Sequence, residues 1–190
     1  MAARIAVLVS GSGSNMEALA DACAADEVPG EVAMVASDRP CRALEIAGDR
    51  GIPTQLVEFS AFGSRDEWSH ALRDVVVTCE PDLVVSAGFM RILSPEFVDA
   101  FEGRLINLHP SLLPAFAGAN AVKDALEFGV KVTGTTVHLV DHQVDHGRIL
   151  LQEAVAILPD DTEEKLHERI KDVEHRLLPE ACRMMLQERT

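Results

Sequence analysis

Short apolar runs alternate with longer amphipathic segments between residues 5 and 108, and this alternation constrains the fold more than any other feature. The runs are apolar at consecutive positions, as in strands that are covered on both faces. The segments after the first three runs (16–23, 40–47 and 68–76) repeat apolar residues at helical spacing. We therefore predict an α/β fold with a doubly wound, mostly parallel sheet. Its expected strands are residues 5–10, 32–37, 54–57, 83–87 and 105–108.

The pattern changes after Pro110. Residues 119–128 have a helical pattern that ends at Gly129, and two strand-like segments follow at 132–140 and 149–158. The polar stretch between them predicts a long-looped antiparallel hairpin at one edge of the sheet, in the C-terminal half. Asp161 lies three residues before Glu164, which is capping-box spacing and predicts the start of a last helix. We expect one domain spanning residues 1–190.

Charge and composition narrow the class of partner. The chain has 17 Lys and Arg against 31 Asp and Glu, a formal net charge of −14, with 4% aromatic residues. Such a surface repels phosphate backbones and anionic lipid, so we expect neither nucleic-acid nor membrane binding. No apolar stretch approaches the roughly 20 residues of a membrane span, and no signal peptide is evident. The four scattered cysteines (Cys23, Cys41, Cys79, Cys182) indicate buried thiols, and we expect a cytoplasmic protein.

A glycine-rich loop, residues 11–15 (Gly-Ser-Gly-Ser-Asn), separates the first predicted strand from the first predicted helix. Glycine lets the backbone approach a ligand closely, and the free amides at a helix start favour an anion. A third glycine for a dinucleotide is missing at Met16, and so is the lysine of a nucleotide-triphosphate loop. We interpret the loop as the cradle of a single phosphate. A merely tight turn remains an alternative, as does a nicotinamide enzyme with Asp38 reading a ribose.

Asn107 and His109 lie two residues apart at the end of a predicted strand, so their side chains face the same way. An amide donor beside an imidazole suits a reaction that develops an oxyanion and moves a proton. A carboxylate is needed to orient the imidazole, and Asp145 in the hairpin loop is a candidate. From the residues alone, His109 is better interpreted as a packed strand-end histidine than as a catalytic one.

Four segments together resemble the folate-dependent formyltransferases, and the first of them resembles the glycinamide ribonucleotide branch of that family. The segments are residues 10–15 (Ser-Gly-Ser-Gly-Ser-Asn), 87–93 (Ala-Gly-Phe-Met-Arg-Ile-Leu), 107–114 (Asn-Leu-His-Pro-Ser-Leu-Leu-Pro) and 134–138 (Gly-Thr-Thr-Val-His). The resemblance is collinear from about residue 4 to about residue 178. It implies a Rossmann-like formyltransferase fold.

The resemblance also implies a reaction. A formyl group would pass from 10-formyltetrahydrofolate, as co-substrate, directly to the amine of glycinamide ribonucleotide, in de novo purine synthesis, with no metal and no covalent enzyme intermediate. Asn107 and protonated His109 would stabilise the tetrahedral oxyanion, while Asp145 would hold His109 and assist proton movement. The other implied contacts are Gly13, Ser14 and Asn15 for the substrate phosphate, Glu174 for the ribose, Met90, Arg91, Ile92, Leu93, Val140 and Asp141 for the pterin, and Arg65 for the folate tail.

Three positions depart from the family pattern. Ala117 stands where proline is common, Asn120 where histidine is common, and Arg148 where proline commonly follows the catalytic loop. The effect of these changes on the loops is not given by the sequence.

Other interpretations remain open. A formyltetrahydrofolate hydrolase or a methionyl-tRNA formyltransferase-like enzyme would share the catalytic trio, and a non-catalytic folate- or nucleotide-binding module is the alternative of another class. His138, His142 and His146 recur every four residues, but they begin in a strand-like run, so we expect no metal site there. The expected partners are the two small molecules, and a homodimer is compatible with the sequence.

Overall fold

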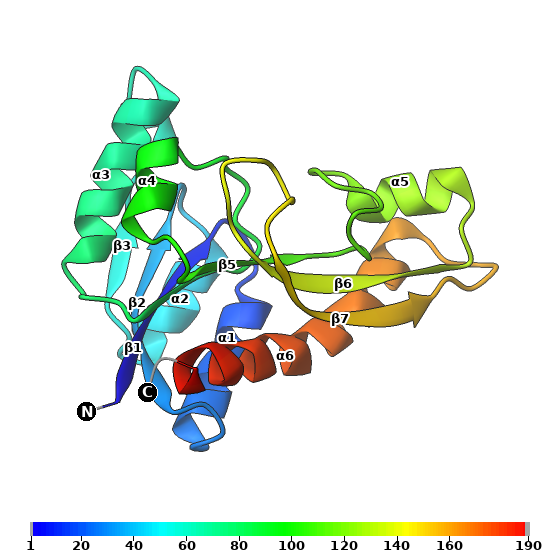
Figure 1. The fold of residues 1–190 in the computed structure, drawn as a ribbon, viewed down its shortest axis with the longest axis horizontal. Helices are drawn as coiled ribbons and strands as arrows, with labels where there is room; N and C mark the ends of the chain where they lie inside the picture. Colours follow the sequence, from blue (N-terminus) through cyan, green and yellow to red (C-terminus); the bar gives the residue numbers. More distant parts are fainter. Residues whose placement is uncertain (1, 189–190) are drawn as a thin grey trace.

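The computed structural model describes residues 2–188, which form a seven-stranded sheet covered by helices on both faces (Figure 1). The strand order is β3-β2-β1-β4-β5-β6-β7. Neighbours from β3 to β5 are parallel, whereas β6 is antiparallel to both β5 and β7. The predicted doubly wound α/β sheet with an antiparallel hairpin at its edge is therefore confirmed.

The elements follow the predicted order closely. The strands are β1 (Ala3–Val9), β2 (Gly30–Ser37), β3 (Thr54–Leu56), β4 (Leu83–Ser86), β5 (Leu105–His109), β6 (Val132–Leu139) and β7 (Ile149–Ala156). The helices are α1 (Ser14–Ala24), α2 (Arg42–Asp49), the short 3₁₀ helix η1 (Phe59–Ala61), α3 (Arg65–Val77), α4 (Pro95–Ala100), α5 (Ala121–Phe128) and α6 (Glu163–Gln187).

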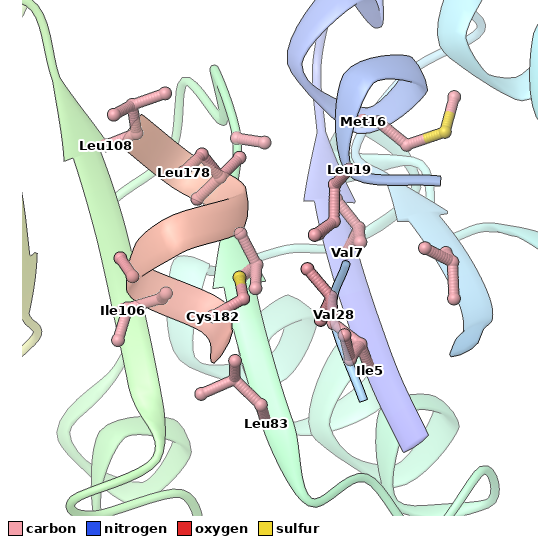
Figure 2. Packing of buried hydrophobic residues seen from close by; sticks show 14 of the residues in the cluster. Ile5, Val7, Met16, Leu19, Val28, Leu83, Ile106, Leu108, Leu178 and Cys182 are labelled. Carbon is pink, nitrogen blue, oxygen red and sulfur yellow. The ribbon is translucent and has the colours of Figure 1, made fainter. Parts of the chain in front are cut away.

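Each face of the sheet packs its own hydrophobic layer. Alternate side chains of β1 explain this, because Ile5 and Val7 face one layer and Ala6 and Leu8 face the other. Helices α1, α2 and α6 cover the first face, and α3 and α4 cover the second. Figure 2 shows α6 in the first layer, where Leu178 and Cys182 approach β4 and β5. The long helix α6 thus places its middle turns beside the first helix and the sheet.

Two details of the helices differ from the prediction. The cap of α6 is Thr162, whose hydroxyl accepts a hydrogen bond from Lys165 N, so the assignment of Asp161 as the cap is wrong by one residue. The Asp161 carboxylate instead accepts from Leu158 N and pairs with Arg169, 2.6 Å away. The other difference is α4, which the sequence pattern missed because its six residues are too short to show a helical period.

The four cysteines are free thiols, as expected, but only Cys79 and Cys182 are buried, while Cys23 and Cys41 are partly exposed. Burial raises the pKa of the Cys23 thiol to about 11. No helix among residues 2–188 is long and apolar enough to cross a membrane.

Candidate active site

The predicted site residues gather where the order of the strands reverses, between β1 and β4. In an open parallel sheet this is where the connections at the carboxyl ends diverge and leave a crevice for ligands. The glycine loop follows β1, residues 87–94 follow β4, and His109 ends β5. The loop between β6 and β7, yellow in Figure 1, reaches toward α4, and His142 Nε2 lies 2.8 Å from Asp99 Oδ1 of that helix.

The glycine loop has a conformation that only glycine adopts easily. Gly13 has φ +84°, and a Cβ atom there would lie 2.7 Å from the Cα atom of Ala43 in α2. Gly13 directly precedes α1, whose first turn begins at Ser14 and Asn15. The three predicted phosphate residues therefore form a tight turn that leaves the first amides of a helix available to an anion.

Asn15 and Glu174, predicted to contact one substrate, are in direct contact although they are far apart in the sequence. Asn15 Nδ2 donates to Glu174 Oε2 at 2.8 Å, and Thr135 Oγ1 lies 3.4 Å from Glu174 Oε1. Glu174 is 4% exposed. Burial raises the pKa of this carboxyl, and the bonds from Asn15 and Thr135 offset part of the rise. The site thus contains a buried carboxyl that joins α6 to the glycine loop.

The predicted catalytic trio comes together around Asp145. Asp145 Oδ2 lies 3.4 Å from His109 Nδ1, and Asn107 Nδ2 donates to Asp145 Oδ1 at 3.4 Å. The amide of Gly118 donates to Asp145 Oδ2 at 2.8 Å. Asp145 itself has φ +52°, a left-handed conformation that aspartate and asparagine tolerate better than most residues. The structure therefore supplies the carboxylate that the imidazole needs.

The charge state of the trio follows from its contacts. Burial acts to raise the pKa of Asp145, but contacts with His138 and the Gly118 amide and the nearby histidine charges outweigh it and hold the pKa below its usual value. The second ring nitrogen of His109, Nε2, lies 2.9 Å from the carbonyl oxygen of Phe116. Both nitrogens of this ring face oxygen acceptors, an arrangement that a doubly protonated imidazole satisfies.

His138 is a site residue to which the sequence assigned no role. It is directly opposite Asn107 in the β5–β6 register, and its Nε2 lies 3.2 Å from Asn107 Nδ2. Its Nδ1 lies 2.8 Å from the carbonyl oxygen of Leu139, and its Nε2 also lies 3.6 Å from Asp145 Oδ1. His138 therefore lies against both the amide of Asn107 and the carboxylate of Asp145. Sequence reasoning missed this contact because it depends on the antiparallel register of β5 and β6.

The residues predicted for the pterin lie on two loops. Met90 and Ile92 are 62% and 57% exposed, so the loop after β4 presents apolar side chains to solvent. Leu93 and Val140 pack partly buried on the same hydrophobic cluster, which brings the two loops together. Asp141 accepts from Gln143 N at 2.8 Å within the second loop.

Two predicted features stand apart from this group. Arg65 begins α3 and forms an ion pair with Asp66 at 3.3 Å, with no contact to the loop residues in the part of the chain that the structure describes. The three histidines at four-residue spacing have separate partners, since His138 faces Asn107, His142 faces Asp99 and His146 faces Asp141. Among residues 2–188, no group of three or more His, Cys, Asp or Glu side chains is arranged to hold a metal ion.

The residues that depart from the family pattern, Ala117, Asn120 and Arg148, are all exposed. Asn120 precedes α5 without a side-chain cap bond, and the carbonyl of Arg148 accepts from Leu139 N at 2.9 Å.

Comparisons with known proteins identify the family that this chain resembles. Residues 3–182 match the model of the formyl transferase family. A phosphoribosylglycinamide formyltransferase from Mycobacterium tuberculosis is 53% identical over 93% of this chain and 81% of its own length. The human trifunctional purine biosynthetic protein adenosine-3 is 44% identical over 96% of this chain, which spans 18% of that longer protein. Among solved structures, glycinamide ribonucleotide transformylase 1 from Symbiobacterium toebii superposes with a TM-score of 0.96 at 45% identity, covering 98% of this chain and 89% of its own.

Proposed function

Because this chain belongs to the formyl transferase family, we infer that it transfers a formyl group to the amine of glycinamide ribonucleotide, a step of purine biosynthesis. The observation that carries the inference is that Asn107 Nδ2 and His109 Nδ1 each lie 3.4 Å from a carboxylate oxygen of Asp145, in a family whose close relatives bear that activity. The donor is a folate-derived formyl carrier, and we propose 10-formyltetrahydrofolate. We further propose that residues 1–190 act as one domain, in the cytoplasm, where free thiols such as these persist.

We propose a direct transfer through a tetrahedral intermediate. The substrate amine forms a bond to the formyl carbon, and the carbonyl electron pair moves to oxygen. The Nε2–H of His109 leaves the Phe116 carbonyl, and one N–H of the Asn107 amide leaves Asp145 Oδ1, so that both donate to this oxyanion. Collapse of the tetrahedral intermediate restores the carbonyl and breaks the bond between the formyl carbon and N10 of the folate. The proton lost by the amine passes through water near Asp145 to N10, so protons and electrons balance.

We also propose which residues bind the ribonucleotide and the folate. The glycine-loop amides at Gly13, Ser14 and Asn15 hold the phosphate, and Glu174 holds the ribose through its buried carboxyl. The exposed apolar side chains of Met90 and Ile92, with Arg91, Leu93, Val140 and Asp141 beside them, provide the surface for the pterin, and Arg65 lies toward the folate tail.

The test mixes purified protein with glycinamide ribonucleotide and 10-formyltetrahydrofolate and follows the deformylated folate by absorbance. We expect release that depends on the amine, together with a formylated product seen by mass spectrometry. Release without the amine would identify a formyltetrahydrofolate hydrolase, and binding of both ligands without release would identify a non-catalytic binding module. Formylation of charged methionyl-tRNA, tested in parallel, would identify the tRNA-directed alternative.

A further inference from the structure

A buried carboxylate that the proposed reaction does not use links Ser10, directly after β1, to the loop after β4 (residues 87–94), which carries part of the proposed pterin surface. Asp38 directly follows β2, and its side chain is fully covered from solvent. Ser10 donates to Asp38 Oδ1 at 2.7 Å, and the guanidinium groups of Arg91 and Arg39 both reach Asp38 Oδ2 at 2.8 Å. Because the side chain is fully covered, Asp38 presents no carboxylate oxygen to a ribose hydroxyl, and the nicotinamide interpretation is not supported.

The contacts of Asp38 hold it ionised. Burial acts to raise its pKa, but the hydrogen bonds from Arg39, Ser10 and Arg91 outweigh burial and lower the pKa. The two arginines lie partly exposed, with side chains 44% and 33% accessible for Arg39 and Arg91. One negative and two positive charges leave this cluster with a formal charge of +1.

The cluster anchors the loop after β4 at two neighbouring residues. The amide of Met90 donates to Ser10 Oγ at 2.9 Å, and Ser10 in turn donates to Asp38. The next residue, Arg91, donates its Nε to the same carboxylate, and its guanidinium carbon lies 4.0 Å from the centre of the Phe59 ring. A carboxylate on one side and an aromatic face on the other therefore hold Arg91 in one orientation.

We propose that Asp38 is a positioning residue for the formyl donor, acting through Ser10 and Arg91 to hold residues 88–93 in the shape that receives the folate. This inference rests on the proposed function, because the same residues are there assigned to the pterin. Asp38 does not itself touch the substrate. The glycine loop is held separately, since Ala43 N donates to the carbonyl of Gly11 at 3.1 Å. The effect of Asp38 therefore falls on the folate and not on the ribonucleotide.

The test compares Asp38→Asn with the wild type and with a matched control, Asp161→Asn. Asp161 is also a carboxylate with a covered side chain, 3% exposed and paired with an arginine, but it lies at the start of α6. Loss of a charge-assisted hydrogen bond predicts a KM for 10-formyltetrahydrofolate roughly tenfold higher in Asp38→Asn. The KM for glycinamide ribonucleotide and kcat should stay within about twofold of wild type. Asp161→Asn should lower Tm and leave both KM values unchanged.

A second measurement needs no substrate. Hydrogen exchange followed by mass spectrometry should show faster exchange of residues 87–94 in Asp38→Asn and in Ser10→Ala, and no change there in Asp161→Asn. Unchanged exchange, or equal increases in both KM values, would overturn the positioning role. If the wild type transfers no formyl group, the proposed function fails instead, and the exchange result alone then decides whether Asp38 anchors the loop.

Discussion

Replacement of Asp145 by asparagine is the sharpest test of the proposed catalytic site, because it removes the charge with little change of shape; the one acceptor that it loses is Oδ1, which faces Asn107 Nδ2 at 3.4 Å. Asparagine has the same shape and also tolerates the left-handed backbone that Asp145 adopts at φ +52°. Its side-chain oxygen can still accept from the Gly118 amide, which lies 2.8 Å from the carboxylate. The substitution therefore removes the negative charge that faces His109 and leaves the loop in place.

The size of the effect follows from the geometry. Unit charges on Asp145 Oδ2 and His109 Nδ1, 3.4 Å apart, attract by about 5 kcal/mol at an effective dielectric constant of about 20. The asparagine dipole recovers part of this, so we expect a net loss of about 3–4 kcal/mol in stabilisation of the charged ring. That loss corresponds to a fall in kcat of roughly 10²- to 10³-fold.

The assay is the absorbance change of the folate at saturating concentrations of both substrates, with their binding measured separately by calorimetry. Dissociation constants should remain within about threefold of wild type, because Asp145 contacts His109 and Asn107 and is assigned no contact with either substrate. The control is Asp26→Asn, the same substitution at another left-handed aspartate, φ +60°, in the turn between α1 and β2. A kcat for Asp145→Asn within threefold of wild type, or an equal loss in the control, would refute the reasoning.

Three further predictions concern the substrate half of the site and the core. Gly13→Ala should lower stability by about 1–3 kcal/mol in urea unfolding and raise the KM for the ribonucleotide, because the new methyl would press on the Ala43 backbone at positive φ. Burial raises the pKa of Glu174, so its stabilising contribution is complete below its unfolded pKa and is lost as pH rises through the folded value. The Tm of Glu174→Gln, relative to wild type, should therefore increase from about pH 4 to pH 8. Cys79 and Cys182 are buried with raised pKa, so a thiol reagent at pH 8 should label them only after unfolding.

The sheet could be predicted because burial on both faces leaves a direct record in the sequence. Strands β1, β2, β4 and β5 are buried at consecutive positions and carry the apolar runs from which they were predicted. The edge strands β3 and β7 are largely exposed and carry a weaker signal, although the predicted strands coincide with β1 to β7 to within a few residues. The residue that caps a helix is less clearly specified by the sequence. Asp161 and Thr162 are both good caps, and the choice between them depends on Arg169, which captures the carboxylate only once the helix has formed.

The site was predictable to the extent that it lies along one strand. Asn107 and His109 share a face because they are two residues apart on β5. Asp145 was a candidate because the imidazole needs a carboxylate, and the family resemblance then matched it to the catalytic trio; no spacing relates a residue in a long loop to a strand 38 positions earlier. His138 required the β5–β6 register, and the link from Asp38 to Arg91 required knowledge of how the loops after β2 and β4 meet. Tertiary contacts of this kind are not encoded in local periodicity.

The acidity of the chain affects anion binding differently at long range and within the proposed site. A net charge of −14 repels a phosphorylated substrate and a folate carboxylate at long range, but this field is screened beyond about 8–10 Å at physiological ionic strength. Within that distance, the proposed phosphate site consists of uncharged amides at the start of α1, and the proposed folate surface lies beside a cluster in which Arg39 and Arg91 share Asp38. The single carboxylate does not neutralise both guanidinium groups, but its hydrogen bonds fix their positions. On this proposal, oriented dipoles and a fixed arginine would admit small anions that fit the site, whereas polyanions would also have to approach the acidic surface around it.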